Sequence, residues 1–199
     1  MVLEKLVLAS GNAGKLKELA HMLKPLDTEV VSQQAFNVPE VDETGLTFVE
    51  NALLKARAAA RISKLPALGD DSGLVVDALD GQPGIYSARF AGDKASDADN
   101  NALLLEKLSG LPAERRGASF YCCLVMLRHA NDPAPLIVTG TWYGHILEAP
   151  RGQQGFGYDP LFHDAQLGAT AAELSMAEKA RVSHRGQALT KLIEALKEG

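Results

Sequence analysis

The sequence predicts an α/β protein built on a twisted, mixed β-sheet with flanking helices. Helical and strand-like stretches mix along the chain. The stretches 119–127 and 136–141 are rich in β-branched and aromatic residues and give the strongest strand signals. No helix is predicted between these two long strands, so the sheet is not expected to be a strict alternation of parallel strands and helices.

The predicted strands are short apolar runs bounded by polar or glycine-containing segments. In chain order they cover residues 6–9, 28–31, 67–69, 74–76, 119–127 and 136–141. The third and fourth strands are expected to be separate because the polar and small residues from Asp70 to Gly73 predict a turn between them. Polar loops are expected over 35–46 and, rich in glycine, over 150–170.

The predicted helices follow the spacing of apolar residues and the positions of helix-ending prolines. They cover residues 15–23, 47–64, 95–108 and a stretch that begins at Ser183. Pro25 is expected to end the first helix and Pro66 the second. The apolar stripe predicted for the second helix is Val49, Leu53, Ala56 and Ala60, with Asn51 and Lys55 on the polar side. In the last helix, one apolar face is formed by Leu189, Leu192, Ile193 and Leu196.

The composition is that of an ordinary globular chain. Of its 199 residues, 46% are apolar and 23% are charged, and the formal net charge is −5. Such a chain buries roughly 70% of its unfolded surface, so a single domain over 1–199 is expected. Disorder, a membrane span and a secretory signal are not predicted. The acidic balance argues against nucleic acid as the main partner, but a small anionic ligand needs only a local cluster of donors.

The two cysteines, Cys122 and Cys123, are adjacent in a predicted strand. Successive strand side chains point to opposite faces, so this pair neither forms an easy disulfide nor offers two ligands to one metal. We interpret both as buried structural residues. This cysteine usage is typical of a reducing compartment, and a cytoplasmic location is expected.

Two groups of residues in the first part of the chain predict chemistry. Ser10-Gly11-Asn12-Ala13-Gly14-Lys15 lies between a strand and a helix, where backbone N–H groups, the helix dipole and Lys15 can bind a phosphate. An ordinary strand-to-helix turn is the alternative, because the spacing matches no standard phosphate motif. Asp70, Asp71 and Glu43 offer hard oxygen ligands that suit Mg²⁺. Their alternative is a polar turn plus a helix cap.

Two further groups lie near the C-terminus. Glycines flank Phe156 in Gly155-Phe156-Gly157-Tyr158-Asp159-Pro160, so its ring can stack on a nucleobase or cap the core. In Ser183-His184-Arg185-Gly186, Arg185 falls in a first helical turn, where a cation opposes the helix dipole. It therefore serves either a ligand carbonyl or phosphate, or it is simply solvated. Taken together, the four groups predict a site for a nucleoside polyphosphate.

The sequence resembles the noncanonical purine nucleoside triphosphate pyrophosphatases, also called ITPase/XTPase or dITP/XTP pyrophosphatases, and in particular their bacterial members. The resemblance runs the length of the chain through the motifs above, Glu43-Thr44-Gly45-Leu46-Thr47-Phe48-Val49-Glu50-Asn51-Ala52, Asp70-Asp71-Ser72-Gly73-Leu74 and Pro83-Gly84-Ile85-Tyr86-Ser87-Ala88-Arg89. It implies a homodimer of two-lobed subunits with the site in a cleft between the lobes. It also implies a Mg²⁺-dependent hydrolase that converts ITP, dITP and XTP to the monophosphate and pyrophosphate and so cleanses the nucleotide pool.

The resemblance also implies roles for individual residues. Glu43 and Asp71 match the metal-binding carboxylates, and Asp71 is also the expected general base. Phosphate binding falls to Ser10, Gly11, Asn12, Ala13, Gly14, Lys15 and Lys55. The remaining substrate contacts fall to Ser72, Phe156, Gly157, Tyr158, Asp159, Lys179, His184 and Arg185. A related pyrophosphatase acting on modified pyrimidines and a nucleotide-sensing module without hydrolysis are the alternatives.

Overall fold

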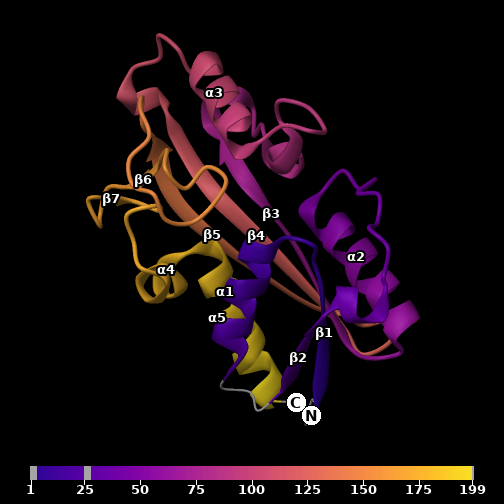
Figure 1. The fold of residues 1–199 in the computed structure, drawn as a ribbon. Coiled ribbons are helices and arrows are strands. Elements are labelled where there is room, and N and C mark those ends of the chain that lie inside the picture. Colours follow the sequence, from indigo (N-terminus) through magenta and orange to yellow (C-terminus); the bar gives the residue numbers. More distant parts are fainter. Residues whose placement is uncertain (1–3, 25–27, 199) are drawn as a thin grey trace. The chain divides into compact units, whose positions relative to one another are not determined.

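A computed structural model describes residues 4–24 and 28–198. Seven strands form one open sheet in the order β2-β1-β3-β4-β5-β6-β7 (Figure 1). Their bounds are Lys5–Ala9 (β1), Glu29–Ser32 (β2), Ala67–Val76 (β3), Gly117–Leu127 (β4), Leu136–Ile146 (β5), Phe162–Asp164 (β6) and Ala169–Thr170 (β7). β1 pairs in parallel with β2 and β3, whereas β6 pairs antiparallel with β5 and β7. The prediction of a mixed sheet with flanking helices is therefore confirmed.

The chain divides into two compact units, each described here by itself. Unit 1 comprises Met1–Asp71, Cys122–Gly140 and Arg185–Gly199, and unit 2 comprises Ser72–Tyr121 and Thr141–His184. The boundary falls within the three long strands β3, β4 and β5, each of which continues from one unit into the other.

Helices cover both faces of the unit 1 sheet because the strand side chains alternate. α1 (Ala13–Leu23) and α5 (His184–Glu198) lie together on one face (Figure 1). They form an apolar cluster with β1, β3 and β4 that includes Leu6, Leu8, Leu19, Leu23, Leu68, Leu124, Leu189 and Leu192. The predicted apolar face of the last helix is confirmed. Val7, Ala9 and Ala67 point the other way, toward α2 (Phe48–Ser63).

The predicted apolar stripe of α2 is partly wrong. Its buried residues are Asn51, Ala52, Ala56, Ala59 and Ala60, whereas Val49 is exposed. The reason is close packing on β3, because a Cβ at Gly69 would lie 2.0 Å from the carbonyl oxygen of Ala52. Only small side chains fit at such an approach, so alanines form the contact and larger apolar residues lie outside it.

We expect Gly69→Ala to lower the free energy of unfolding by about 2 kcal/mol, because the added methyl overlaps the α2 backbone and forces helix and strand apart. Urea denaturation measures the change. Gly11→Ala is the matched control, since a Cβ there meets nothing closer than an ordinary contact of 3.5 Å. Equal denaturation midpoints for the two variants would contradict this packing.

The unit 2 core lies between α3 (Asp97–Lys107) and the sheet. Leu74, Leu104, Phe120, Trp142 and Phe162 are among its buried residues. The buried guanidinium of Arg116 donates to the carbonyl oxygens of Leu108, Ile146 and Leu147 at 2.7–2.9 Å. One side chain thereby satisfies acceptors both after α3 and at the end of β5.

Three other expectations are corrected. Residues 67–76 form one continuous strand, so no turn separates Asp70 from Leu74. The loop predicted over 150–170 contains the short strands β6 and β7. A helix over Met176–Val182 (α4) was not predicted, although its capping box, Ser175 with Glu178, is a recognisable sequence signal. Pro25, expected to end the first helix, lies outside the described residues.

Cys122 and Cys123 are both buried free thiols, as predicted. Burial raises the pKa of Cys123 to about 11 and raises that of Cys122 well above its usual value. Both side chains are therefore neutral at pH 7 and behave as small apolar residues. None of the helices in the described ranges has the length and apolarity that a bilayer crossing requires.

Candidate functional site

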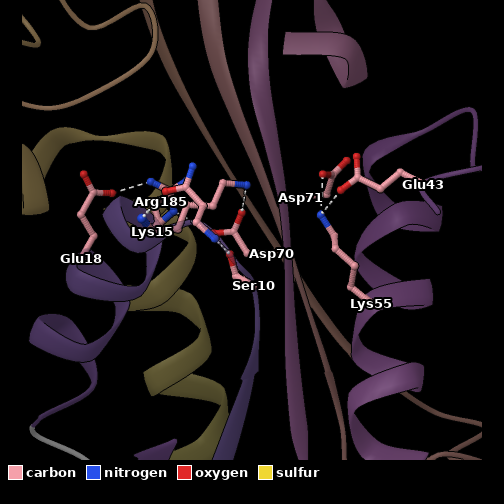
Figure 2. A network of polar contacts seen from close by, with 9 residues as sticks. Ser10, Lys15, Glu18, Glu43, Lys55, Asp70, Asp71 and Arg185 are labelled. Carbon is pink, nitrogen blue, oxygen red and sulfur yellow. Dashed lines mark hydrogen bonds and ion pairs between the residues drawn. The ribbon is translucent and has the colours of Figure 1, made fainter. Parts of the chain in front are cut away.

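Asp70 and Asp71 organise two polar clusters in unit 1. They are consecutive in β3, so their side chains leave opposite faces of the strand. Figure 2 shows Asp70 on the side of α1 and α5 and Asp71 on the side of α2. The continuous strand, rather than the predicted turn, thus separates the two carboxylates.

Asp70 is the centre of the first cluster. Its carboxylate accepts from Nζ of Lys15 at 2.8 Å and from Nε of Arg185 at 2.7 Å. Arg185 also pairs with Glu18 on α1. Burial raises the pKa of Asp70, but the charges of Arg185 and Lys15 outweigh burial and hold this pKa well below its usual range. Because Lys15 and Arg185 neutralise its charge, Asp70 can remain buried, and β3 continues through this residue without a turn to the surface.

Arg185 is therefore not a solvated arginine, since only 2% of the residue is exposed. Burial lowers its pKa, but Asp70 and Glu18 reverse that effect and the pKa lies above its usual value. The local cost of a cation in the first turn of α5 is offset by these two carboxylates.

Lys55 is the centre of the second cluster. Its Nζ lies 2.9 Å from Oε1 of Glu43 and 2.8 Å from Oδ1 of Asp71. One ammonium therefore holds together the two carboxylates expected to bind a metal (Figure 2). Oδ2 of Asp71 is shielded from solvent and has no hydrogen-bond partner within the described ranges. A buried carboxylate oxygen without a donor is unusual and fits a position that faces a ligand.

The same environment shifts the pKa of both partners. Burial raises the pKa of Asp71, and the opposing charges of Lys55 and Lys15 do not fully reverse this rise. Burial lowers the pKa of Lys55, but Asp71 and Glu43 outweigh it and leave the pKa of Lys55 above its usual value. Asp71 is therefore a stronger base than an ordinary aspartate, beside a lysine that stays protonated.

The loop that carries Glu43 is fixed by the first turn of α2. Asn51, fully buried, accepts through Oδ1 from the Gly45 N–H at 2.8 Å, and Glu50 accepts from the Leu46 N–H at 2.9 Å. A Cβ at Gly45 would lie 2.7 Å from Oδ1 of Asn51, so glycine is required for this approach. Asn51, predicted on the polar side of α2, is instead a buried anchor.

The turn from Ser10 to Lys15 forms the start of α1. Asn12 caps the helix by accepting from the Lys15 N–H at 3.0 Å, and Ser10 Oγ accepts from the Asn12 N–H at 3.2 Å. Gly11, Asn12 and Ala13 are exposed, and Gly14 is partly buried. The side-chain cap leaves other N–H groups of the first turn available, as anion binding at a helix start requires.

A separate polar group lies in unit 2. Oδ2 of Asp159 accepts from Nζ of Lys179 at 2.6 Å and from the Phe156 N–H at 3.0 Å. Nζ of Lys179 lies 5.0 Å from the centre of the Phe156 ring. Gly155 has φ +81°, and a Cβ there would meet Oδ2 of Asp159 at 2.0 Å. The glycine thus lets the loop close on the buried ion pair.

The two aromatic residues of this loop have different surroundings. Tyr158 is buried in the unit 2 core, and its hydroxyl donates to the Ser87 carbonyl at 2.9 Å. Phe156 is only partly buried and lies outside that core cluster. Capping of the core therefore describes Tyr158, whereas the Phe156 ring keeps an exposed part. His184 is buried and stacks on Phe120 with ring centres 4.9 Å apart.

The structure brings the predicted residues together in two sets. Unit 1 joins Lys15 to Asp70 and Arg185, and joins Lys55 to Glu43 and Asp71. Unit 2 joins Phe156, Asp159 and Lys179, with Ser72 partly buried on its part of β3. Within residues 4–24 and 28–198, no three His, Cys, Asp or Glu side chains gather as a metal cluster.

Comparison with known proteins identifies the family of this chain. The model of the Ham1 family matches residues 6–195, which include every group described above. This chain belongs to the Ham1 family. A protein of Yersinia pseudotuberculosis named dITP/XTP pyrophosphatase is 55% identical over 98% of this chain and 100% of its own length. A protein of Escherichia coli strain K12 with the same name is 52% identical over 99% of this chain and 100% of its own length. The solved structure of a Ham1 protein from Coxiella burnetii is 48% identical in sequence, with a TM-score of 0.92, and the match covers 99% of this chain and 100% of that one.

Two residues that complete the polar clusters of this Ham1 protein had no assigned role in the sequence prediction. They are Glu18, which pairs with Arg185, and Asn51, which holds the Glu43 loop. Asp70 was predicted as a possible oxygen ligand for Mg²⁺, and in the structure it pairs with Arg185 and Lys15. Only the Gly45-to-Asn51 contact has a local sequence signal, a glycine just before a helix cap. The partners of Glu18 and Asp70 come from distant segments, so no local pattern indicates them.

Proposed function

We propose that this chain hydrolyses noncanonical purine nucleoside triphosphates, namely ITP, dITP and XTP, to the monophosphate and pyrophosphate with Mg²⁺. The observation that carries the proposal is the Glu43–Lys55–Asp71 cluster, in which one lysine holds two carboxylates beside an unpartnered Asp71 oxygen. The names of full-length relatives at 52–55% identity support the same activity.

Glu43 and Asp71 would hold the metal ion. Mg²⁺ typically takes one or two carboxylates and completes its shell with water and substrate phosphate. The pair of Glu43 and Asp71, which no third acidic side chain joins as a cluster in the described residues, therefore suits it. The unpartnered Oδ2 of Asp71 provides an oxygen ligand already free of competing donors. When bound, Mg²⁺ neutralises phosphate charge and polarises the phosphoanhydride.

The chain's own residues then supply binding and proton transfer. The turn from Ser10 to Lys15 binds phosphate oxygens through backbone N–H groups, and Lys15 and Lys55 stabilise the negative charge that grows on the leaving pyrophosphate. Asp71 accepts a proton from the attacking water, for which its raised pKa suits it. The bond that breaks is the α–β phosphoanhydride, so pyrophosphate leaves intact.

Base recognition is assigned to residues of unit 2 together with Arg185 of unit 1. Phe156 stacks on the purine, with Gly157 and Tyr158 shaping its loop, and Ser72 lies in the substrate site. Asp159, Lys179, His184 and Arg185 recognise the base edge. A donor facing the 6-keto group of hypoxanthine or xanthine is left unpaired by the 6-amino group of adenine, which disfavours ATP strongly.

We further propose that residues 1–199 act as one two-lobed domain, that the protein works as a homodimer, and that it cleanses the nucleotide pool of the cytoplasm. The family resemblance supports the dimer and the domain. The buried free thiols fit a reducing compartment.

The deciding assay compares ITP, XTP, GTP and ATP with and without Mg²⁺. We expect pyrophosphate as the first product from ITP and XTP, a kcat/KM for ATP at least about 100-fold lower, and loss of activity with EDTA that Mg²⁺ restores. Orthophosphate as the first product, or equal turnover of ATP and ITP, would refute the proposal. Preference for a modified pyrimidine would favour the related pyrophosphatase, and binding without turnover the sensing module.

A further inference from the structure

Both backbone polar groups of Gly157 bond to side chains of α3. The N–H of Gly157 donates to Oδ2 of Asp97 at 2.6 Å, and its carbonyl accepts from Nδ2 of Asn101 at 2.8 Å. Asp97 and Asn101 are four residues apart, so they lie on the same face of the helix. All three residues belong to unit 2. One helix face therefore clamps a single residue, Gly157, by the polar groups of the two peptide units on either side of it, in the loop that carries Phe156.

The orientation of the Asn101 amide is fixed by its partners. Nδ2 donates to two carbonyl oxygens, that of Gly157 at 2.8 Å and that of Asp97 at 2.7 Å. A flipped amide would place oxygen against both carbonyls, so the assignment is unambiguous. Oδ1 is consequently left shielded from solvent and without a hydrogen-bond partner in the part of the chain that the structure describes. A shielded acceptor without a partner costs free energy, so we infer that the hydrogen bond from Nδ2 to the Gly157 carbonyl outweighs the cost of leaving Oδ1 unpaired.

The clamp lies next to the residue whose ring must be placed. Gly157 has φ +60°, a left-handed conformation that the chain must hold directly after Phe156. Phe156 is only partly buried and is not a member of the unit 2 core cluster. Its backbone is held on one side by Asp159 and on the other by the α3 clamp on Gly157.

We propose that Asp97 and Asn101 are positioning residues that fix the Phe156 ring as a rigid stacking platform for the purine base. This rests on the proposed function, since it assigns to α3 the preorganisation of the base site. Neither residue needs to touch the substrate. Fixing the ring before binding removes the ordering cost from each binding event, which lowers KM and leaves the phosphate chemistry unchanged.

The first experiment tests, without any nucleotide, whether the side chains of α3 protect the Gly157 backbone. Amide hydrogen exchange at Gly157 is compared in the full-length wild type and in Asp97→Ala, Asp97→Asn and Asp99→Ala. We expect exchange to become about tenfold faster in Asp97→Ala, and faster by a smaller factor in Asp97→Asn, which keeps an acceptor oxygen. Asp99→Ala is the matched control, because among the described residues Asp99 bonds to Ser96 alone, in the capping box of the same helix turn.

The second experiment measures how loss of the clamp changes substrate and product binding at the base site. Asp97→Ala and Asn101→Ala are expected to raise KM for ITP about tenfold and to weaken binding of inosine monophosphate similarly, with kcat within about twofold of wild type. Asn101→Asp should be at least as impaired, because it opposes a carboxylate to the Gly157 carbonyl. Asp99→Ala should lower the melting temperature while keeping KM.

The outcomes separate the two proposals. If Gly157 exchange is unchanged in Asp97→Ala, the clamp is refuted whatever the enzyme does. If exchange rises but KM and inosine monophosphate binding match those of Asp99→Ala, the clamp exists and its positioning role is refuted. If the wild type fails to hydrolyse ITP, the proposed function fails, and the exchange data still decide whether α3 holds the loop.

Discussion

Replacing Asp71 by asparagine is expected to lower kcat for ITP by about 10³-fold or more while substrate binding remains measurable. Asparagine keeps the size of the side chain but cannot accept the proton of the attacking water, and it is a poorer ligand for a divalent cation. The Lys55 ammonium keeps Glu43 as its counter-ion, so the site stays paired.

Steady-state kinetics on ITP, together with calorimetric titration of ITP into the inactive variant, measure both parts of this result. Asp99→Asn makes the same change from carboxyl to amide on an exposed helix turn and should retain wild-type kcat. Wild-type turnover by Asp71→Asn would show that another group is the base. Loss of all detectable binding would show that Asp71 acts mainly in holding the substrate.

Replacing Asp70 by asparagine is expected to lower the free energy of unfolding by about 4 kcal/mol at pH 7. Asp70 is buried between Lys15 and Arg185, and its neutral substitute leaves two cations without their shared counter-charge. Urea denaturation gives the loss. Adding Arg185→Met to Asp70→Asn should lower stability by less than the sum of the single changes, because it removes one of the two cations that have lost Asp70.

The pH dependence of this difference has a defined sign. The pKa of Asp70 is lowered on folding, so its contribution is complete above the unfolded value of about 3.9 and is lost as the pH falls from there toward the folded pKa. The stability gap between the wild type and Asp70→Asn should therefore be constant above about pH 5 and narrow below about pH 4. A gap that widens in acid would contradict the charged pairing.

The features predicted correctly from sequence are those with local causes. Apolar runs predicted β1, β4 and β5, and caps and helical spacing predicted α2, α3 and α5. These patterns arise from neighbours within one or two turns of chain.

The features predicted wrongly depend on partners far along the chain. Asp70 and Asp71 suggest a turn when read locally, yet Arg185 and Lys55 neutralise them and keep β3 straight. The buried face of α2 was predicted wrongly because it depends on the close approach of the helix to Gly69. The spacing of apolar residues along the helix does not indicate such a contact. The alternative of a solvated Arg185 is wrong because its partners Glu18 and Asp70 lie far earlier in the chain, where no local pattern indicates them.

The division of unit 1 into three chain segments sets the order in which a ribosome can supply its core. β1 and α1 emerge early, but Leu19 and Leu23 pack against Leu189 and Leu192 of α5. Both segments of unit 2 are synthesised before that helix. The unit whose first segment is made first is therefore completed last, and the share of α5 in the cluster around Leu19 and Leu23 is added only after both segments of unit 2.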